Sequence, residues 1–114
     1  MGPVLKPAIR VLVVDDHPVV RDGVELLTHT SARKIQIVGY APNGETAREI
    51  TREAAPDVIL VDLRLPDTLA PELVRELRDR APDAKLLIFT AYPDHPAVEA
   101  ALASGAHGVL PKDT

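Results

Sequence analysis

Five short apolar runs alternate along this chain with segments that carry helical spacing. The runs are rich in β-branched residues and contain few polar residues, which is typical of strands buried on both faces of a sheet. They cover residues 9–14, 35–40, 58–61, 86–89 and 109–110, and helices are expected over about 18–30, 44–54, 71–80 and 96–104. Asn43 is placed to cap the second helix and Gly105 to end the fourth. This order predicts one parallel sheet with right-handed crossovers and helices on both faces.

Polar residues follow four of the five runs at the point where each run ends. Asp15 and Asp16 follow the first run, Asp62 the third, Thr90 the fourth and Lys112 the last. Parallel strands bring their carboxyl ends to one edge of the sheet, where open α/β sheets bind ligands. The sequence therefore predicts that two acidic sites, a hydroxyl and an amine meet at that edge.

This set of groups suits a divalent cation and a phosphoryl group. Mg²⁺ prefers oxygen ligands, and without a cation the clustered carboxylates would repel one another and raise the pKa of at least one. Lys112 offsets part of that repulsion, and the Thr90 hydroxyl can donate to a phosphoryl oxygen. We expect phosphoryl transfer onto Asp62, which is single and central, with Asp15 and Asp16 as the cation-holding pair.

Each residue alone also has an ordinary structural interpretation. An Asp after a strand is often a turn or cap residue, and Asp15 and Asp16 before a helix would favour its dipole. Thr90 and Lys112 carry little information singly, so the prediction depends on the set and its order. We interpret His17 as a loop residue packed at the start of the first helix, with a metal ligand or a phosphorelay residue as the alternative.

Composition excludes several other classes of protein. The 114 residues fit one domain, and the net charge of −4 without a Lys/Arg stripe argues against nucleic-acid binding by this segment alone. There is no cysteine for a disulfide or thiolate site, and no apolar stretch approaches the roughly 20 residues of a membrane span. Residues 1–8 are expected to form a short tail that is not a signal peptide, so we expect a cytoplasmic protein.

The sequence resembles the receiver domain of two-component response regulators over residues 10–112. Residues 57–66, which contain Asp62, are similar to the phosphoacceptor segment, and Thr90-Ala91 and Pro111-Lys112 match the remaining switch elements. Residues 11–21 look like the opening of the branch whose members carry a C-terminal LuxR-type helix-turn-helix domain. The resemblance implies a flavodoxin-like doubly wound sheet with strand order 2-1-3-4-5.

The resemblance also implies roles for individual residues. Asp62 would be the phosphoacceptor and a histidine kinase the donor, so the domain would catalyse only its own phosphorylation and dephosphorylation. Asp16, Asp62 and the backbone of Arg64 would bind Mg²⁺ directly, with Asp15 acting through water. Thr90 would move toward the phosphate, which would change the packing or dimerisation of the fourth helix and fifth strand.

The chain departs from the family pattern at several positions. Val109 stands where an aromatic residue usually couples to the threonine, so that coupling is not expected in its usual form. Ala70 replaces a common Gly and Pro71 follows it, which predicts altered geometry in the loop after Asp62. Arg64 and Tyr92 occupy positions that tune phosphate lifetime, and their bulk and charge predict a long-lived phosphoryl state.

Five strands with four helices suggest a receiver domain over 9–114 that is truncated before a fifth helix. The uncovered face would be a site of self-association, and residues 95–110 are a second candidate for a homodimer face. Small side chains there allow either close approach of a partner or ordinary helix-on-sheet packing: Ala97, Ala100, Ala101 and Ala103. DNA would be bound only through a C-terminal helix-turn-helix domain outside this chain.

Two other functions were weighed against the phosphorylation switch. A phosphorylation-independent module would signal through dimerisation or a bound small molecule, and Val109 and Ala70 favour it. A Mg²⁺-dependent phosphohydrolase would need Asp-x-Asp after the first strand, where this chain has Asp15-Asp16-His17. A dinucleotide-binding fold lacks its G-x-G-x-x-G motif here.

Overall fold

The computed structural model describes residues 8–18, 20–24 and 34–112. Its strands and helices follow in the order β1 Ile9–Val14, β2 Ile35–Ala41, α2 Gly44–Ala54, β3 Val58–Asp62, α3 Ala70–Arg80, β4 Lys85–Thr90, α4 Pro96–Ala103 and β5 Gly108–Pro111. All neighbouring strands are parallel, in the order β2-β1-β3-β4-β5. The predicted flavodoxin-like sheet and its strand order are therefore confirmed.

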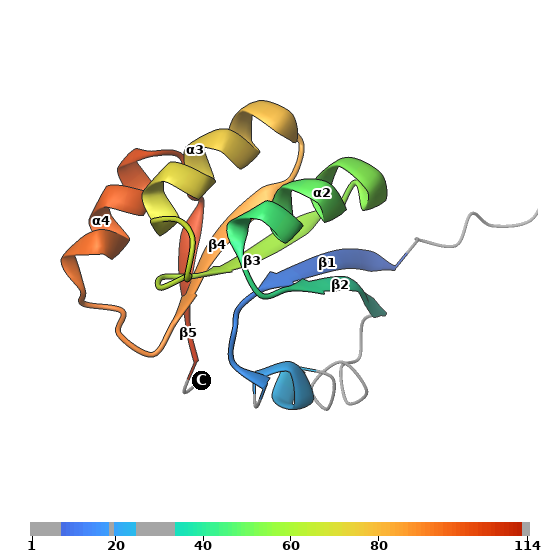
Figure 1. Cartoon of the computed structure of the whole chain (residues 1–114), viewed down its shortest axis with the longest axis horizontal. Coiled ribbons are helices and arrows are strands. Elements are labelled where there is room, and N and C mark those ends of the chain that lie inside the picture. The colour runs from blue at the N-terminus through green and yellow to red at the C-terminus, as the bar shows by residue number, and fades with distance from the viewer. Residues whose placement is uncertain (1–7, 19, 25–33, 113–114) are drawn as a thin grey trace, which may run out of the picture.

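Helices α2, α3 and α4 cover one face of the sheet (Figure 1). The main core lies under them and contains Leu12, Ile59, Leu73, Leu77 and Ile88, all fully buried. A smaller cluster on the other face is built on Val11, Val13 and Leu60. Within the described residues, no helix has the length and hydropathy needed to cross a membrane.

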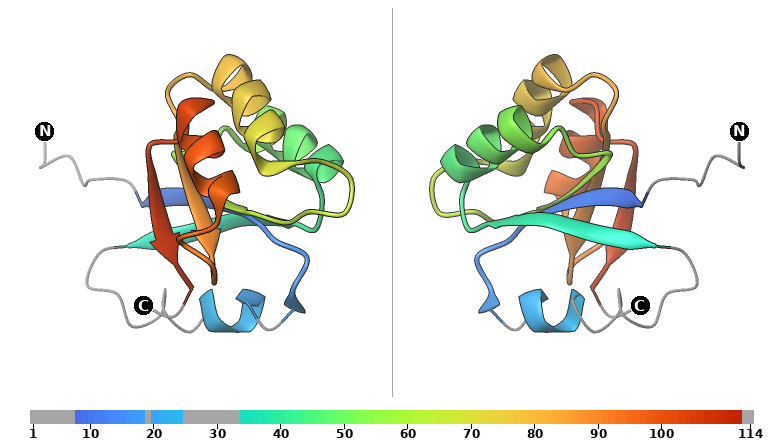
Figure 2. Two further views of the ribbon diagram at one scale, coloured as in Figure 1. Left: turned by 90° about the vertical axis from the view of Figure 1, so that its left-hand side faces the viewer. Right: turned by 90° about the vertical axis from the view of Figure 1, so that its right-hand side faces the viewer.

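The chain is helical at Pro18 and over residues 20–24, on the opposite face of the sheet from α2–α4 (Figure 2). Val20 and Val24 pack there against the smaller cluster, as the predicted apolar stripe of the first helix requires. The rest of that predicted helix, to residue 30, lies outside the described residues. This helix begins at Pro18, two residues after the acidic pair that follows β1.

Capping residues set the ends of α2 and α4 as the sequence predicts. The Asn43 side chain accepts a hydrogen bond from the Thr46 amide at 2.8 Å, which satisfies one of the free donors at the start of α2. Gly105 follows the Ser104 cap of α4 with φ +124°, and a Cβ there would lie 2.8 Å from Arg78 Cγ. Glycine is required at that position by both its dihedral angle and its contact.

The observed strands, except β1, are slightly longer than the apolar runs. Asp62 is the last residue of β3 and lies opposite Phe89, and Thr90 is the last residue of β4 and lies opposite Pro111. Two predicted site residues thus still belong to the hydrogen-bonded sheet, so their backbone positions are fixed by neighbouring strands.

Candidate functional site

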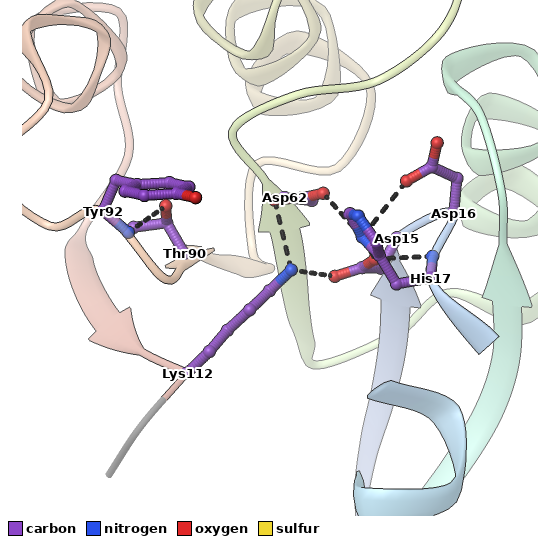
Figure 3. A network of polar contacts seen from close by, with 7 residues as sticks. All are labelled: Asp15, Asp16, His17, Asp62, Thr90, Tyr92 and Lys112. Carbon is purple, nitrogen blue, oxygen red and sulfur yellow. Dashed lines mark hydrogen bonds and ion pairs between the residues drawn. The ribbon is translucent and has the colours of Figure 1, made fainter. Parts of the chain in front are cut away.

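The loops that leave the strand ends are held by backbone hydrogen bonds to adjacent strands. The Asp15 amide donates to the Ala41 carbonyl at the end of β2, and the Lys112 amide donates to the Thr90 carbonyl at the end of β4, both at 2.8 Å. These bonds aim Asp15 and Lys112 at the edge where β3 delivers Asp62 (Figure 3). The predicted meeting of the acidic, hydroxyl and amine groups at one edge of the sheet is observed.

Lys112 bridges the two buried carboxylates of the site. Its Nζ lies 2.7 Å from Asp15 Oδ2 and 3.4 Å from Asp62 Oδ1, and the two carboxylate side chains are only 2% and 6% exposed. Asp16 lies at the rim, where its side chain reaches solvent. One ammonium thus faces two buried carboxylates and compensates only part of their charge.

His17 points its ring among the carboxylates. Its Nδ1 lies 2.7 Å from Asp15 Oδ1, 3.2 Å from Asp16 Oδ1 and 3.5 Å from Asp62 Oδ2. The side chain is 55% exposed. His17 thus lies in the loop that leads into the first helix, as interpreted from the sequence, and its ring contacts the acidic site.

The electrostatics of the site raise the pKa of both Asp62 and His17, which disfavours the charged form of the carboxyl and favours the charged form of the imidazole. Burial, together with the neighbouring charge of Asp15, raises the pKa of the Asp62 carboxyl above its ordinary value. The hydrogen bond to Asp15 and the charge of that carboxylate raise the pKa of His17. The predicted rise in the pKa of one clustered carboxyl therefore falls on Asp62.

The donor set fits a divalent cation. Ligand atoms from Asp15, Asp16, His17 and Asp62 all lie within 4.8 Å of one another. Asp62 Oδ2 is buried and accepts no hydrogen bond from any described residue. A buried carboxylate oxygen that accepts no hydrogen bond, beside an exposed acidic rim, is the arrangement that a hard cation such as Mg²⁺ would satisfy.

A cavity of about 300 Å³ opens beside Asp62. It is lined by His17, Val20, Asp62, Leu63, Arg64, Thr90, Ala91, Tyr92 and Lys112. The buried Thr90 hydroxyl accepts a hydrogen bond from the Tyr92 amide at 2.9 Å. The Arg64 guanidinium lies 5.6 Å from the centre of the exposed Tyr92 ring, a cation–π contact at the mouth of the cavity.

The loop after Asp62 is tied to the start of α2 by Asp67, a residue that sequence reasoning did not single out. Asp67 Oδ1 accepts from the Gly44 amide at 2.8 Å and Oδ2 from the Glu45 amide at 3.1 Å. Arg64 and Leu69 form an antiparallel bridge within the same loop. The loop is thus held at both of these points, and Ala70 is fully buried at the start of α3. The altered loop geometry expected from Ala70 and Pro71 stays a prediction.

Replacement of Asp67 by Ala is expected to lower the melting temperature at neutral pH. The two amide bonds lower the pKa of Asp67, so its stabilisation is complete above the ordinary value of 3.8 and is lost as the pH falls through the lower folded-state value. Thermal melts followed by circular dichroism should show the deficit at pH 7 and its disappearance in strong acid. The exposed Asp83, replaced by Ala, is the matched control; equal deficits in both variants would contradict the capping role.

Val109 lies in the fifth strand and the alanine-rich segment forms the fourth helix, as the sequence predicts. Val109 lies opposite Ile88 in the sheet and packs, partly buried, against the main core. In α4, Ala101 is fully buried against the sheet, whereas Ala100 and Ala103 are exposed. The helix therefore packs Ala101, and the partly buried Ala97, against the core and leaves the other two alanines at the surface.

A larger cavity, of about 620 Å³, lies away from these residues. It is lined by residues at the end of α2, the end of α3 and the loops that follow them, including Thr51, Arg52, Asp57, Arg80 and Asp83. Those segments lead into β3 and β4, so this cavity lies at the amino ends of the strands. It contains none of the residues that meet around Asp62.

Comparisons with known proteins agree with this geometry. A family model described as "Response regulator receiver domain" matches residues 11–114. The chain is 40% identical to the transcriptional regulatory protein YdfI of Bacillus subtilis, over 92% of this chain and 48% of that protein. It is 41% identical to the DNA-binding transcriptional activator DevR/DosR of Mycobacterium tuberculosis, with the same two shares. The chain thus spans about half the length of these curated relatives.

Solved structures lead to the same family. The signal receiver domain of NarL from Mycobacterium tuberculosis superposes with a TM-score of 0.85 at 34% identity, over 96% of this chain and 87% of that one. A LuxR-family response regulator from Aurantimonas gives 0.83 at 31% identity, over 95% and 76%. The chain belongs to the response regulator receiver domains of two-component systems.

Proposed function

We propose that this chain is a phosphoacceptor receiver domain that takes a phosphoryl group onto Asp62 with the help of Mg²⁺. The observation that carries the proposal is the Asp62 carboxylate: it is buried at the end of β3, one of its oxygens has no hydrogen-bond partner among the described residues, and it borders a cavity of about 300 Å³. A nucleophile needs a free oxygen and space for the incoming group, and Asp62 has both.

In the proposed reaction an Asp62 oxygen attacks phosphorus and forms the acyl phosphate. The bond from phosphorus to the donor breaks, and its electron pair leaves with the donor, a phosphohistidine of a histidine kinase or acetyl phosphate in vitro. Lys112 lies close enough to Asp62 to pair with a phosphoryl oxygen, and the Thr90 hydroxyl retains its hydrogen for donation. The protein contributes mainly position and charge.

Mg²⁺ would be held by Asp16, Asp62 and the Arg64 backbone, with Asp15 acting through water. When bound it would neutralise charge on the carboxylates and on the phosphoryl oxygens. Asp15 is already paired with Lys112 at 2.7 Å, which is consistent with an indirect role for that carboxylate.

The rest of the signalling pathway follows from the LuxR-type relatives, each about twice the length of the matched region. We infer a cytoplasmic protein in which residues 9–114 belong to the receiver and a C-terminal helix-turn-helix domain binds DNA. Phosphorylation would act through the α4–β5 face, where exposed Ala100 and Ala103 permit close approach of a second copy. Apart from its own phosphorylation and dephosphorylation, the domain would catalyse no reaction.

A phosphorylation-independent module is the second candidate. Val109 is packed against the core beside β4 and has no aromatic ring to follow a movement of Thr90. Such a module would keep the fold and the dimer face without acyl phosphate formation. Phosphoryl incorporation separates the two candidates directly.

The test is the intact mass after incubation with acetyl phosphate and Mg²⁺. The proposal predicts a gain of one phosphoryl group, and no gain when a chelator removes the cation. Absence of any gain in folded protein that binds Mg²⁺ would favour the phosphorylation-independent module.

Arg64 and Tyr92 are expected to prolong the life of the acyl phosphate. Their cation–π pair lies at the mouth of the cavity and restricts the approach of water to Asp62. The double replacement Arg64→Ala with Tyr92→Ala should therefore shorten the half-life of the phosphoryl label severalfold. The mass assay followed over time gives this half-life, with the exposed Arg75→Ala on α3 as control. An unchanged half-life would remove the screening role.

A further inference from the structure

The imidazole of His17 occupies a position that the phosphoacceptor chemistry does not require. Its Nδ1 lies 2.7–3.5 Å from one oxygen of each of three carboxylates, those of Asp15, Asp16 and Asp62 (Figure 3). The Nδ1 atom faces the same space as Asp62 Oδ2, which accepts no hydrogen bond from any described residue. The ring therefore belongs to the group of atoms that would surround a cation.

Charge balance indicates what kind of ligand the site still needs. Lys112 neutralises Asp15 at 2.7 Å, which leaves Asp16 and Asp62 as the two negative groups available to a divalent cation. Two carboxylates already match a charge of +2. A further protein ligand is therefore best provided by a neutral group, and a neutral imidazole adds a donor atom without adding charge.

The backbone allows His17 to turn from Asp15 to a cation. The His17 amide donates to Asp15 Oδ1 at 2.9 Å, and the ring Nδ1 contacts the same oxygen at 2.7 Å. If the ring leaves, the amide bond still satisfies that oxygen, and Lys112 still pairs with Oδ2. Because the side chain is half exposed, the rotation breaks no core packing.

We propose that His17 is a nitrogen ligand of the cation site and shifts its preference from Mg²⁺ toward metals that accept imidazole, such as Mn²⁺ and Co²⁺. The inference rests on the proposed cation site at Asp62 and specifies which cations that site favours. Mg²⁺ prefers oxygen donors, whereas imidazole nitrogen suits first-row transition metals. Any site with both nitrogen and oxygen ligands binds Co²⁺ more tightly than Mg²⁺. The informative quantity is therefore the change in the ratio of the Co²⁺ and Mg²⁺ affinities when His17 is replaced.

The test compares the parent protein with His17→Gln, which keeps the size and polarity of the side chain and offers oxygen in place of a ring nitrogen. Calorimetric titration should show the affinity for Co²⁺ falling about tenfold in the variant. The affinity for Mg²⁺ should stay within about threefold, because Mg²⁺ gains little from nitrogen. Pulsed electron paramagnetic resonance on bound Mn²⁺ should detect nitrogen coupling in the parent and none in the variant.

Several outcomes would overturn the inference. No nitrogen coupling in the parent, or an equal loss of Mg²⁺ and Co²⁺ affinity in the variant, would exclude His17 as a selective ligand. If either result is found and the parent still takes up a phosphoryl group with Mg²⁺, only this inference fails. If it binds neither cation, the proposed Mg²⁺-dependent function fails as well. Asp62→Asn, which removes a carboxylate ligand, should weaken both cations and is the control for binding at this site.

Discussion

Replacement of Asp62 by Asn is expected to abolish phosphoryl incorporation and, without a divalent cation, to raise the thermal stability of the protein. The carboxylate is buried and lies near Asp15 with only Lys112 to compensate the two charges. The amide has nearly the same shape, carries no charge and cannot form an acyl phosphate. The proposed phosphoacceptor thus carries a charge that costs stability, and its replacement separates the effect on phosphoryl transfer from the effect on stability.

The pH dependence of this gain follows from the direction of the pKa shift. Because the folded-state pKa of Asp62 lies above its ordinary value of 3.8, the charged form destabilises the fold above the folded-state value. This destabilisation diminishes as the pH falls and is absent below 3.8, where the carboxyl is protonated in both states. The advantage of the variant should therefore be largest at neutral pH and shrink in acid.

Thermal melts at several pH values, with and without Mg²⁺, measure the effect. We expect a gain of several degrees at pH 7, the size that about 1 kcal/mol produces in a domain of this length. Mg²⁺ should reduce the difference, because it stabilises the parent by binding its carboxylate. Asp83→Asn, at an exposed loop position, is the control. A variant that melts below the parent at pH 7 without metal would contradict the inference that the buried charge of Asp62 destabilises the fold.

Replacement of Lys112 by Met is expected to have the opposite effect on stability. The ammonium is the partner of Asp15 at 2.7 Å and of Asp62 at 3.4 Å, and both carboxylates are buried. Removing one member of a buried ion pair leaves its partner uncompensated, which costs about 3 kcal/mol. The variant should also take up the phosphoryl group more slowly, because a positive charge beside the nucleophile is lost.

A double variant identifies the source of this loss. If the uncompensated Asp15 carboxylate causes most of the destabilisation, Asp15→Asn combined with Lys112→Met should recover much of the stability lost in Lys112→Met alone. Denaturant unfolding gives the free energies of unfolding for the four proteins of this cycle. The exposed Lys85→Met should be nearly neutral. Additive effects of the two substitutions would show that Lys112 does not stabilise the fold through Asp15.

The fold and much of the site follow from local sequence patterns. Continuous apolar runs mark β1–β5 because strands buried on both faces tolerate few polar residues. Asn43 and Gly105 mark helix ends because one offers a side-chain acceptor and the other adopts a positive φ. The site residues were predictable because parallel strands place their carboxyl ends at one edge of the sheet. Residues at or directly after these strand ends therefore meet there.

Contacts between distant segments were not predictable from local patterns. Asp67 anchors its loop to Gly44, 23 residues earlier, and no local pattern identifies that partner. The direction of the His17 ring depends on where β3 places Asp62 relative to β1. The side chain of His95 accepts a hydrogen bond from the Ala97 amide and caps α4. Each of these roles depends on a rotamer or on a tertiary neighbour.

The identity of the modified residue is the most direct test of the account. Borohydride reduction of the protein after treatment with acetyl phosphate and Mg²⁺ converts an aspartyl phosphate to homoserine, which fragmentation of the digested peptides locates. We predict homoserine at position 62 and unmodified Asp15 and Asp16. Homoserine at either of those two positions, or none in protein whose intact mass has increased by a phosphoryl group, would contradict the assignment of Asp62 as the phosphoacceptor.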